Sequence, residues 1–209
     1  IIVAFKDYKY NTGIWFSEWC GLENFKFLFA SGDLARITIN TVGFNAISIA
    51  LGLFIPLVFA VLMYGFTSKT AVRCYQTISI LPSYLSFVII SYIVYSFLSP
   101  SGGLLNILLG KMGIEAPDWY QNPKPWWAIL LITNTWKSTG MGSVLFYTTL
   151  INVDESLFEA AKLDGASKAQ IFRYIIIPCL MSVIIFQLTL QVGGIFGGNF
   201  GLFYNVTKN

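Results

Sequence analysis

The residues of this chain with the most ordered chemical pattern form the stretch FEAAKLDGASKAQIFRYIIIP, which runs from residue 158 to residue 178. Its two carboxylates, Glu159 and Asp164, stand near the small residues Ala160, Ala161 and Ala166. Because small neighbours let another protein approach closely, these acids can pair with a cation on that protein. The chemistry that this pattern favours is recognition of a partner.

Local rules predict two helices joined by a sharp turn in this stretch. Asn152 or Asp154 can cap the first helix, and Gly165 can end it by adopting a positive φ. Ser167 and Gln170 have the spacing of a capping box and so begin the second helix. The result is an L-shaped projection between two apolar segments.

Other chemistries lack the residues they need. The chain has no His, which removes most transition-metal sites and the Ser-His and Cys-His nucleophile pairs. No GxxxxGKS or GxxxxGKT phosphate loop occurs, so we expect the chain to bind no cofactor of its own and to leave ATP hydrolysis to a partner. Cys20, Cys74 and Cys179 lie far apart and are expected to be unpaired. The net charge of +3 comes without a basic cluster of the kind that binds nucleic acid.

The composition is that of a helical membrane protein. Hydrophobic residues make up 56% of the 209 residues and charged residues 11%, against about 25% charged in ordinary soluble domains. Four runs contain no Asp, Glu, Lys or Arg: residues 37–68, 74–110, 138–153 and 174–207. Since about 20 apolar residues suffice for a helix to cross a bilayer, the fold class we expect is an all-α, polytopic helical bundle.

Four full spans are expected, at about residues 38–65, 75–98, 127–151 and 175–196. Pro56, Pro82 and Pro178 should bend the helices in which they lie. The stretch TNTWKSTGMG, which contains Lys137, is expected to interrupt the third span. The opening IIVAF could be the remnant of an earlier span. We therefore expect residues 1–209 to be an incomplete transmembrane domain from a chain with six spans.

The segments between the spans are expected to lie at the membrane surface. Residues 6–36 are polar and aromatic, and Leu22, Phe25 and Phe29 fall on one side of a short helix. Leu104 to Met112 could form a second short surface helix, and residues 152–178 form the loop between the last two spans. Lys and Arg occur on both sides of this topology, so the positive-inside rule does not decide its orientation.

Four polar side chains inside the spans are candidates for contact with a transported substrate: Asn134, Lys137, Gln187 and Gln191. An intramembrane charge such as Lys137 suggests function, although it can also extend to an interface. The amides can equally bond to neighbouring helices. The paired glycines at 193–194 and 197–198 allow close helix packing or a helix break, and we expect packing.

At this point the sequence resembles a family. The spacing Glu-Ala-Ala, three residues, Gly, nine residues, Ile, one residue, Leu-Pro is typical of the permease subunits of ATP-binding cassette importers. It is met by Glu159–Ala161, Gly165, Ile175 and Pro178, with Ile177 in place of Leu. GLENFKFLF, NTVGF, ILPSYLS, GGLLNILLGKMGI and WKSTGMGSVLFYTTLINVDESLFEAAKLDGA also occur in the expected order. The aromatic first loop and the ending GGIFGGNFGLFYNVT look most like the permeases for polysaccharides or oligosaccharides.

The resemblance implies a sugar importer of the bacterial cytoplasmic membrane in which this chain is a transport subunit and not an enzyme. Its partners would be a second permease, two cytoplasmic ATPase subunits that bind ATP and Mg, an extracytoplasmic solute-binding lipoprotein, membrane lipid and the sugar. Residues 152–178 would be the cytoplasmic coupling loop. The residues that the resemblance assigns to ATPase coupling are Glu159, Ala160, Ala161, Asp164, Gly165, Ala166, Phe172 and Pro178.

Two other classes of function fit the sequence less well. An ion-coupled secondary transporter needs buried acids to bind its ion, yet the expected spans contain none, and this class leaves the projecting loop unexplained. An intramembrane enzyme would need His or paired carboxylates within a span, and neither is present. The permease reading accounts for more of the chain than either alternative.

Overall fold

The computed structural model describes residues 2–30 and 32–207. Four residues lie outside this described part: 1, 31, 208 and 209. All four belong to the expected domain 1–209, and residue 31 also belongs to the expected surface segment 6–36. The chain divides into two compact units, Ile1–Gly43 and Phe44–Asn209.

The first unit is a small lobe that ends in the start of a long helix. It contains η1 (Ile2–Phe5), β1 (Lys6–Asp7), α1 (Gly13–Phe16), β2 (Glu18–Trp19) and α2 (Glu23–Ala30), and β1 pairs antiparallel with β2. Lys6 is 5% exposed because its ammonium donates to the carbonyls of Ile14 and Trp15 and lies over the ring of Trp19. The short helix expected after Leu22 is confirmed as α2.

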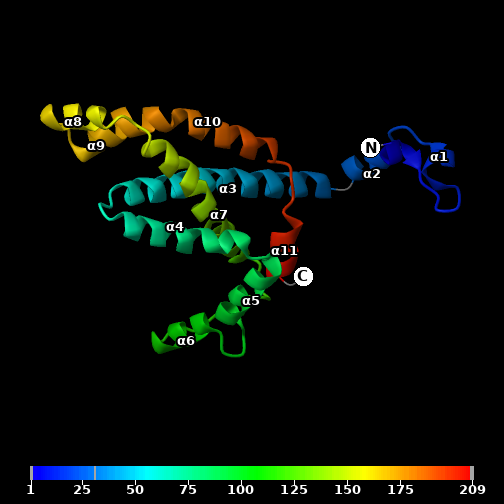
Figure 1. The fold of residues 1–209 in the computed structure, drawn as a ribbon. Coiled ribbons are helices and arrows are strands. Elements are labelled where there is room, and N and C mark those ends of the chain that lie inside the picture. Colours follow the sequence, from blue (N-terminus) through cyan, green and yellow to red (C-terminus); the bar gives the residue numbers. More distant parts are fainter. Residues whose placement is uncertain (1, 31, 208–209) are drawn as a thin grey trace. The chain divides into compact units, whose positions relative to one another are not determined.

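The helices and connecting loops of the second unit contain no strand in its described part (Figure 1). Its helices are the remainder of α3 (Asp33–Tyr64), then α4 (Lys69–Tyr84), α5 (Phe87–Leu98), α6 (Leu104–Lys111), α7 (Trp126–Leu150), α8 (Glu155–Leu163), α9 (Lys168–Ile171), the π-helix η2 (Phe172–Ile176), α10 (Ile177–Gly193) and α11 (Phe200–Thr207). The short helix expected from residue 104 is confirmed as α6.

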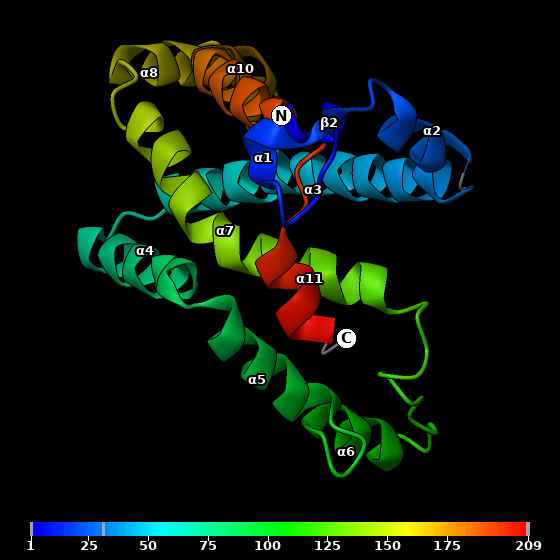
Figure 2. The ribbon, with the colours of Figure 1, turned by 90° about the vertical axis from the view of Figure 1, so that its right-hand side faces the viewer.

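Two clusters of buried apolar side chains hold these helices together, and α7 contributes to both. The first joins α3, α7, α8, η2 and α10 through Leu57, Ala60, Phe146, Leu150, Phe158, Ile176 and Leu180. The second joins α3, α7 and α11 through Phe44, Trp126, Leu130, Leu202 and Val206. Figure 2 shows α11 lying on α7 and beside α5. Helix α7 is therefore the element that links the two clusters.

The span expected at 75–98 is wrong as a single helix. The structure divides it into α4 and α5, which meet at an angle of 103°. Helix α4 continues past Pro82 to Tyr84, and Ser86 then begins α5 by accepting the amide of Ile89 on its hydroxyl. A new N-cap this close to a proline favours a sharp corner over a gradual bend, because the backbone N–H and C=O groups at both ends of the break can find hydrogen-bond partners nearby.

The interruption expected in the third span is also wrong, because α7 runs without a break from Trp126 to Leu150. Its hydroxyl residues bond back along their own helix, as Thr133 does to the carbonyl of Ile129 and Thr139 to that of Thr135. Gly140 marks a close approach to α4: a Cβ there would overlap the carbonyl group of Ser79 and lie 2.6 Å from the amide nitrogen of Ile80.

The last span differs from expectation at both ends. The distortion expected at Pro178 lies just before it, as the π-helical turn η2, and the helix is continuous from Lys168 to Gly193.

The packing expected of the paired glycines is wrong within this chain. Helix α10 ends at Gly193, a Cβ on Gly193 or Gly198 would meet no described atom within 4 Å, and Asn45 donates to the carbonyls of Ile195 and Gly197. The helix that follows the break, α11, was not anticipated from the sequence.

Among the described residues, two helices are long and apolar enough to cross a membrane: α3, and the continuous helix from Lys168 to Gly193. A third crossing results if the bent pair of α4 and α5 is counted as one. Helix α7 has 25 residues, which corresponds to roughly 37 Å. Its polar middle makes it less apolar than the other two, so its crossing stays a prediction.

We expect Gly140→Ala to destabilise the protein, because the added methyl would separate α7 from the backbone of α4. Overpacking of this kind typically costs about 1–3 kcal/mol. Thermal unfolding of the detergent-purified protein measures the effect. The control is Gly110→Ala in α6, where a Cβ would meet no described atom within 4 Å. Equal melting temperatures for the two variants would show that the helices do not depend on this contact.

Candidate functional site

The first helix of the loop at residues 152–178 begins as the sequence predicts, with Asp154 as its cap. One carboxylate oxygen of Asp154 accepts the amide of Ser156 at 3.0 Å. This bond, with a further one from the Ser156 hydroxyl, holds the pKa of Asp154 below its usual value. The carboxylate therefore stays ionised at the N-terminus of α8, where the helix dipole favours negative charge.

The turn after α8 is a complete Schellman motif built on Gly165. This glycine has φ +73, in the left-handed region that residues with a side chain rarely adopt. The amide of Gly165 bonds to the carbonyl of Lys162 at 3.1 Å, and that of Ala166 to the carbonyl of Ala161 at 2.9 Å. The prediction that Gly165 ends the first helix is confirmed.

The second helix begins with the predicted capping box. The Ser167 hydroxyl accepts the amide of Gln170 at 3.3 Å, and the Gln170 side chain accepts the amide of Ser167 at 2.7 Å. The prediction of a short separate helix needs correction, however. Helix α9 continues through η2 into α10, so the second arm of the loop is the first turn of a long apolar helix.

The loop combines a fixed base with an exposed tip. Phe158 is 7% exposed in the first core cluster, where its ring centroid lies 5.6 Å from that of Tyr64. Glu159 and Asp164 are exposed, and neither forms an ion pair among the described residues. Leu163 is 88% exposed beside them, an apolar contact that the sequence reasoning missed. An exposed leucine between two free carboxylates is suited to contact with another protein.

The remaining residues assigned to this loop occupy different positions. Ala160 is exposed and Ala161 and Ala166 are half-buried near the turn. Phe172 packs against the first core cluster, and Pro178 lies in the first turn of α10. The structure therefore places the acids, the alanines and Gly165 together, and separates Phe172 and Pro178 from them.

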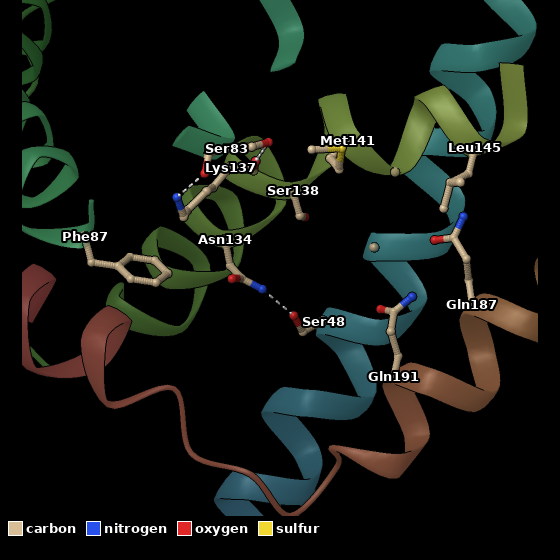
Figure 3. Close-up of a pocket in the computed structure, with 12 residues that line it drawn as sticks. Ser48, Ser83, Phe87, Asn134, Lys137, Ser138, Met141, Leu145, Gln187 and Gln191 are labelled. Carbon is tan, nitrogen blue, oxygen red and sulfur yellow. Dashed lines mark hydrogen bonds between the residues drawn. The ribbon is translucent and has the colours of Figure 1, made fainter. Parts of the chain in front are cut away.

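A second site is a cavity of about 480 Å³ within the helices of the second unit, which is in the size range of ligand pockets. We call it the central cavity. Its lining consists of Ser48, Gly52, Ser83, Phe87, Asn134, Lys137, Ser138, Met141, Gly142, Leu145, Gln187 and Gln191. Figure 3 shows the two glutamines extending from α10 on one side, and Lys137, Ser83 and Phe87 on the other. The four polar span residues singled out from the sequence thus line one cavity.

Lys137 caps the end of α4. Its ammonium donates to the carbonyls of Ser83 at 2.9 Å, Leu85 at 2.5 Å and Pro82 at 3.4 Å, and it lies 5.2 Å from the ring centre of Phe87. The Ser83 hydroxyl donates in return to the carbonyl of Lys137 at 2.7 Å. A helix C-terminus leaves carbonyls without partners and has a partial negative charge, so a cation is favourable there.

The three amide side chains of the cavity have different partners. Asn134 donates to the hydroxyl of Ser48 on α3 at 2.8 Å. Gln191 lies against Gly52, where a Cβ would be 3.0 Å from its amide oxygen. Gln187 is 8% exposed, and its amide nitrogen has no hydrogen-bond partner among the described residues. Sequence reasoning missed Ser48, Ser83 and Gly52, since small residues in an apolar run give no signal of their own.

Apolar helices long enough to cross a bilayer, together with a polar cavity between them, define a membrane transport protein. Residues 27–203 match the family described as binding-protein-dependent transport system inner membrane component, and the chain belongs to that family.

The chain is similar to two proteins of Bacillus subtilis (strain 168). It is 30% identical over 209 residues to Protein LplB, covering all of this chain and 66% of the relative. It is 30% identical over 193 residues to the polygalacturonan/rhamnogalacturonan transport system permease protein YteP, covering 92% of this chain and 60% of the relative. The chain thus spans less than two thirds of the length of either relative.

Among solved structures, the chain is similar to a bacterial ABC transporter involved in the import of the acidic polysaccharide alginate. The two share 28% sequence identity with a TM-score of 0.83, over 90% of this chain and 69% of that one. The fold expected from the sequence, that of an ABC importer permease, is confirmed.

Lys137→Met should destabilise the corner between α4 and α5, because it leaves carbonyl groups without a donor. An unsatisfied buried polar group costs about 1–3 kcal/mol. We expect a lower melting temperature than for Lys124→Met, which removes an exposed lysine from the connection before α7. Lys137→Arg, which keeps the charge and several donors, should fall between the two. Identical melting of both methionine variants would contradict the assignment of Lys137 as a cap.

Proposed function

We propose that this chain is the permease subunit of an ATP-driven importer that moves oligosaccharides or polysaccharide fragments across the cytoplasmic membrane. The observation that carries the proposal is the loop at 152–178, whose tip exposes Glu159, Leu163 and Asp164 while Phe158 fixes its base in the core. Membership of the inner membrane component family supports it.

The loop couples the membrane helices to an ATPase subunit in the cytoplasm. Glu159 pairs with a basic residue of that subunit, and Gly165 gives the turn the shape that fits a groove on it. Two connections can carry the motion inward. Phe158 ties α8 to α3, α7 and α10, and the second arm of the loop is continuous with α10. A displacement of the loop therefore moves the helix that carries Gln187 and Gln191.

The central cavity forms part of the substrate pathway, lined by Asn134, Lys137, Gln187 and Gln191. Amides and hydroxyls match the hydrogen-bonding groups of a sugar, and the Phe87 ring offers an apolar face to it. The named substrates of similar proteins, polygalacturonan or rhamnogalacturonan and alginate, support an oligosaccharide cargo.

The complete transporter contains a second permease, two ATPase subunits that bind ATP and Mg, and an extracytoplasmic solute-binding lipoprotein. A related alginate transporter has been solved in complex with a pentasaccharide-bound periplasmic protein, which supports the last of these partners. Lipid surrounds the spans, and nucleic acid has no part in this function.

Gly165→Val and Glu159→Lys should uncouple ATP hydrolysis from transport. A β-branched residue at positive φ is strained by about 1–2 kcal/mol or more. Removal of one partner from a desolvated ion pair costs about 2–5 kcal/mol. Both full-length variants should insert and pair with the second permease. In proteoliposomes, they should lose the stimulation of ATP hydrolysis by loaded binding protein.

The matched control is Lys168→Ala, which changes an exposed residue of the same loop outside the proposed contact. It should hydrolyse ATP at the wild-type rate with the same stimulation. If Gly165→Val and Glu159→Lys behave like this control, the loop is not the coupling element.

A further inference from the structure

The helix that leads from the loop into the membrane contains one turn that is wider than the others. In η2 the amide of Ile177 donates to the carbonyl of Phe172, five residues back, where an α-helix would bond four residues back. Such π turns are rare and occur mostly singly, frequently at functional sites. This one lies between α9, the second arm of the loop, and α10. One additional residue therefore stands at the junction of the loop and the membrane helix.

The residues around η2 show why the additional residue is needed. Ile171 and Ile176 both contact the first core cluster, whereas Arg173 between them is exposed. In an α-helix, residues three or four apart share a face, and residues five apart lie about 140° from each other around the axis. A regular helix would therefore bring Arg173 onto the buried face with Ile176 and turn Ile171 away from it. The wide turn keeps the isoleucine inside and the arginine outside.

Pro178 weakens the helix at the same place. Proline has no amide proton, so a carbonyl of the preceding turn loses its helical partner, and the proline ring clashes with regular α-helical geometry there. Prolines and π turns are both sites at which helices bend. The outer side of the turn carries the exposed residues Arg173, Tyr174 and Pro178, while Ile176 on the inner side is 6% exposed. The geometry allows the outer side to open about a buried edge.

We propose that η2 is a joint, which lets the loop tilt relative to α10 while the two stay connected. The inference rests on the proposed function and goes further, because it locates the bending movement in one turn. A push along the axis is transmitted, since the helix is continuous from Lys168 to Gly193. A tilt, which a moving ATPase subunit would impose on the tip of the loop, is absorbed where the hydrogen-bond ladder is interrupted.

The joint can be removed without turning the flanking residues. Deletion of Tyr174 places Ile171 four residues before Ile176 in the chain. Arg173 then lies two residues before Ile176, on the other side of a regular α-helix. Pro178→Ala is added, because a proline would clash with the carbonyl four positions earlier. This combined variant of the full-length permease should melt at or above the wild-type temperature. A clear fall would show that η2 holds no additional residue, and would overturn the inference.

The control for melting is deletion of Met181. Met181 is 43% exposed and lies in α10, which has no wide turn to absorb a deletion. Its loss turns the rest of the helix by about 100° against its packing. This variant should melt below the wild type. Equal melting temperatures for the two deletion variants would also overturn the inference.

The second experiment measures transport in proteoliposomes that contain the ATPase subunits and the binding protein. The probes are trigalacturonate and the matched neutral galactotriose. The combined variant should still bind the ATPase, but it should import a probe at about one tenth of the wild-type rate or less, because a straight helix resists the tilt. Import at the wild-type rate would overturn the inference and leave the proposed function standing. Loss of ATPase binding would show that η2 only aims the tip, and would overturn it too. A wild-type transporter that imports neither probe would overturn the proposed function for this sugar class, and the inference that rests on it.

Two single variants separate the turn from its side chains. Tyr174→Ala removes an exposed side chain, keeps the additional residue, and should import at the wild-type rate. Pro178→Ala restores an amide, also keeps the additional residue, and should retain more import than the combined variant. A loss in either single variant as large as in the combined variant would assign the effect to a side chain, and would overturn the inference.

Discussion

The corner between α4 and α5, which shapes one wall of the central cavity, depends on one interaction, the contact of the Lys137 ammonium with the carbonyls at the end of α4. A charge inside a membrane protein is costly unless fixed dipoles replace the water around it, and a helix C-terminus supplies such dipoles. In return, the cation donates to the carbonyls of Ser83 and Leu85 at the break between α4 and α5, where the helix ladder stops, whereas the carbonyl of Pro82 also accepts the amide of Leu85. The charge and the corner therefore stabilise each other.

The close packing of α7 against α4 makes that contact possible. Gly140 lets the two backbones approach within van der Waals distance one turn along from Lys137, and the Ser83 hydroxyl adds a second bond between the helices. Because α7 also contributes to both core clusters, its position relative to α4 is set from several sides. The corner then places Ser83 and Phe87 at the wall of the central cavity. A structural cap thereby determines the shape of the central cavity.

How far the sequence predicted this structure depends on how local each interaction is. The cap at Asp154, the turn at Gly165 and the box of Ser167 and Gln170 are satisfied within a few residues, and all three were predicted. The corner after Pro82 was not predicted, because it is stabilised by Lys137, more than 50 positions away in the chain. The unbroken α7 was not predicted either. A polar stretch such as TNTWKSTGMG has the composition of a break, yet its hydroxyls bond to their own helix and its lysine caps another.

The polar residues of the spans show the same limit in a form that bears on function. The sequence does not distinguish the roles of Asn134, Lys137 and Gln187, since each can bond to a neighbouring helix or line a pathway. In the structure all three line the cavity, and they differ only in what the protein offers them. Asn134 finds a hydroxyl and Lys137 finds carbonyls, whereas the amide nitrogen of Gln187 finds no partner among the described residues. Residue type states what a side chain can bind, but only packing decides which of those bonds the protein itself supplies.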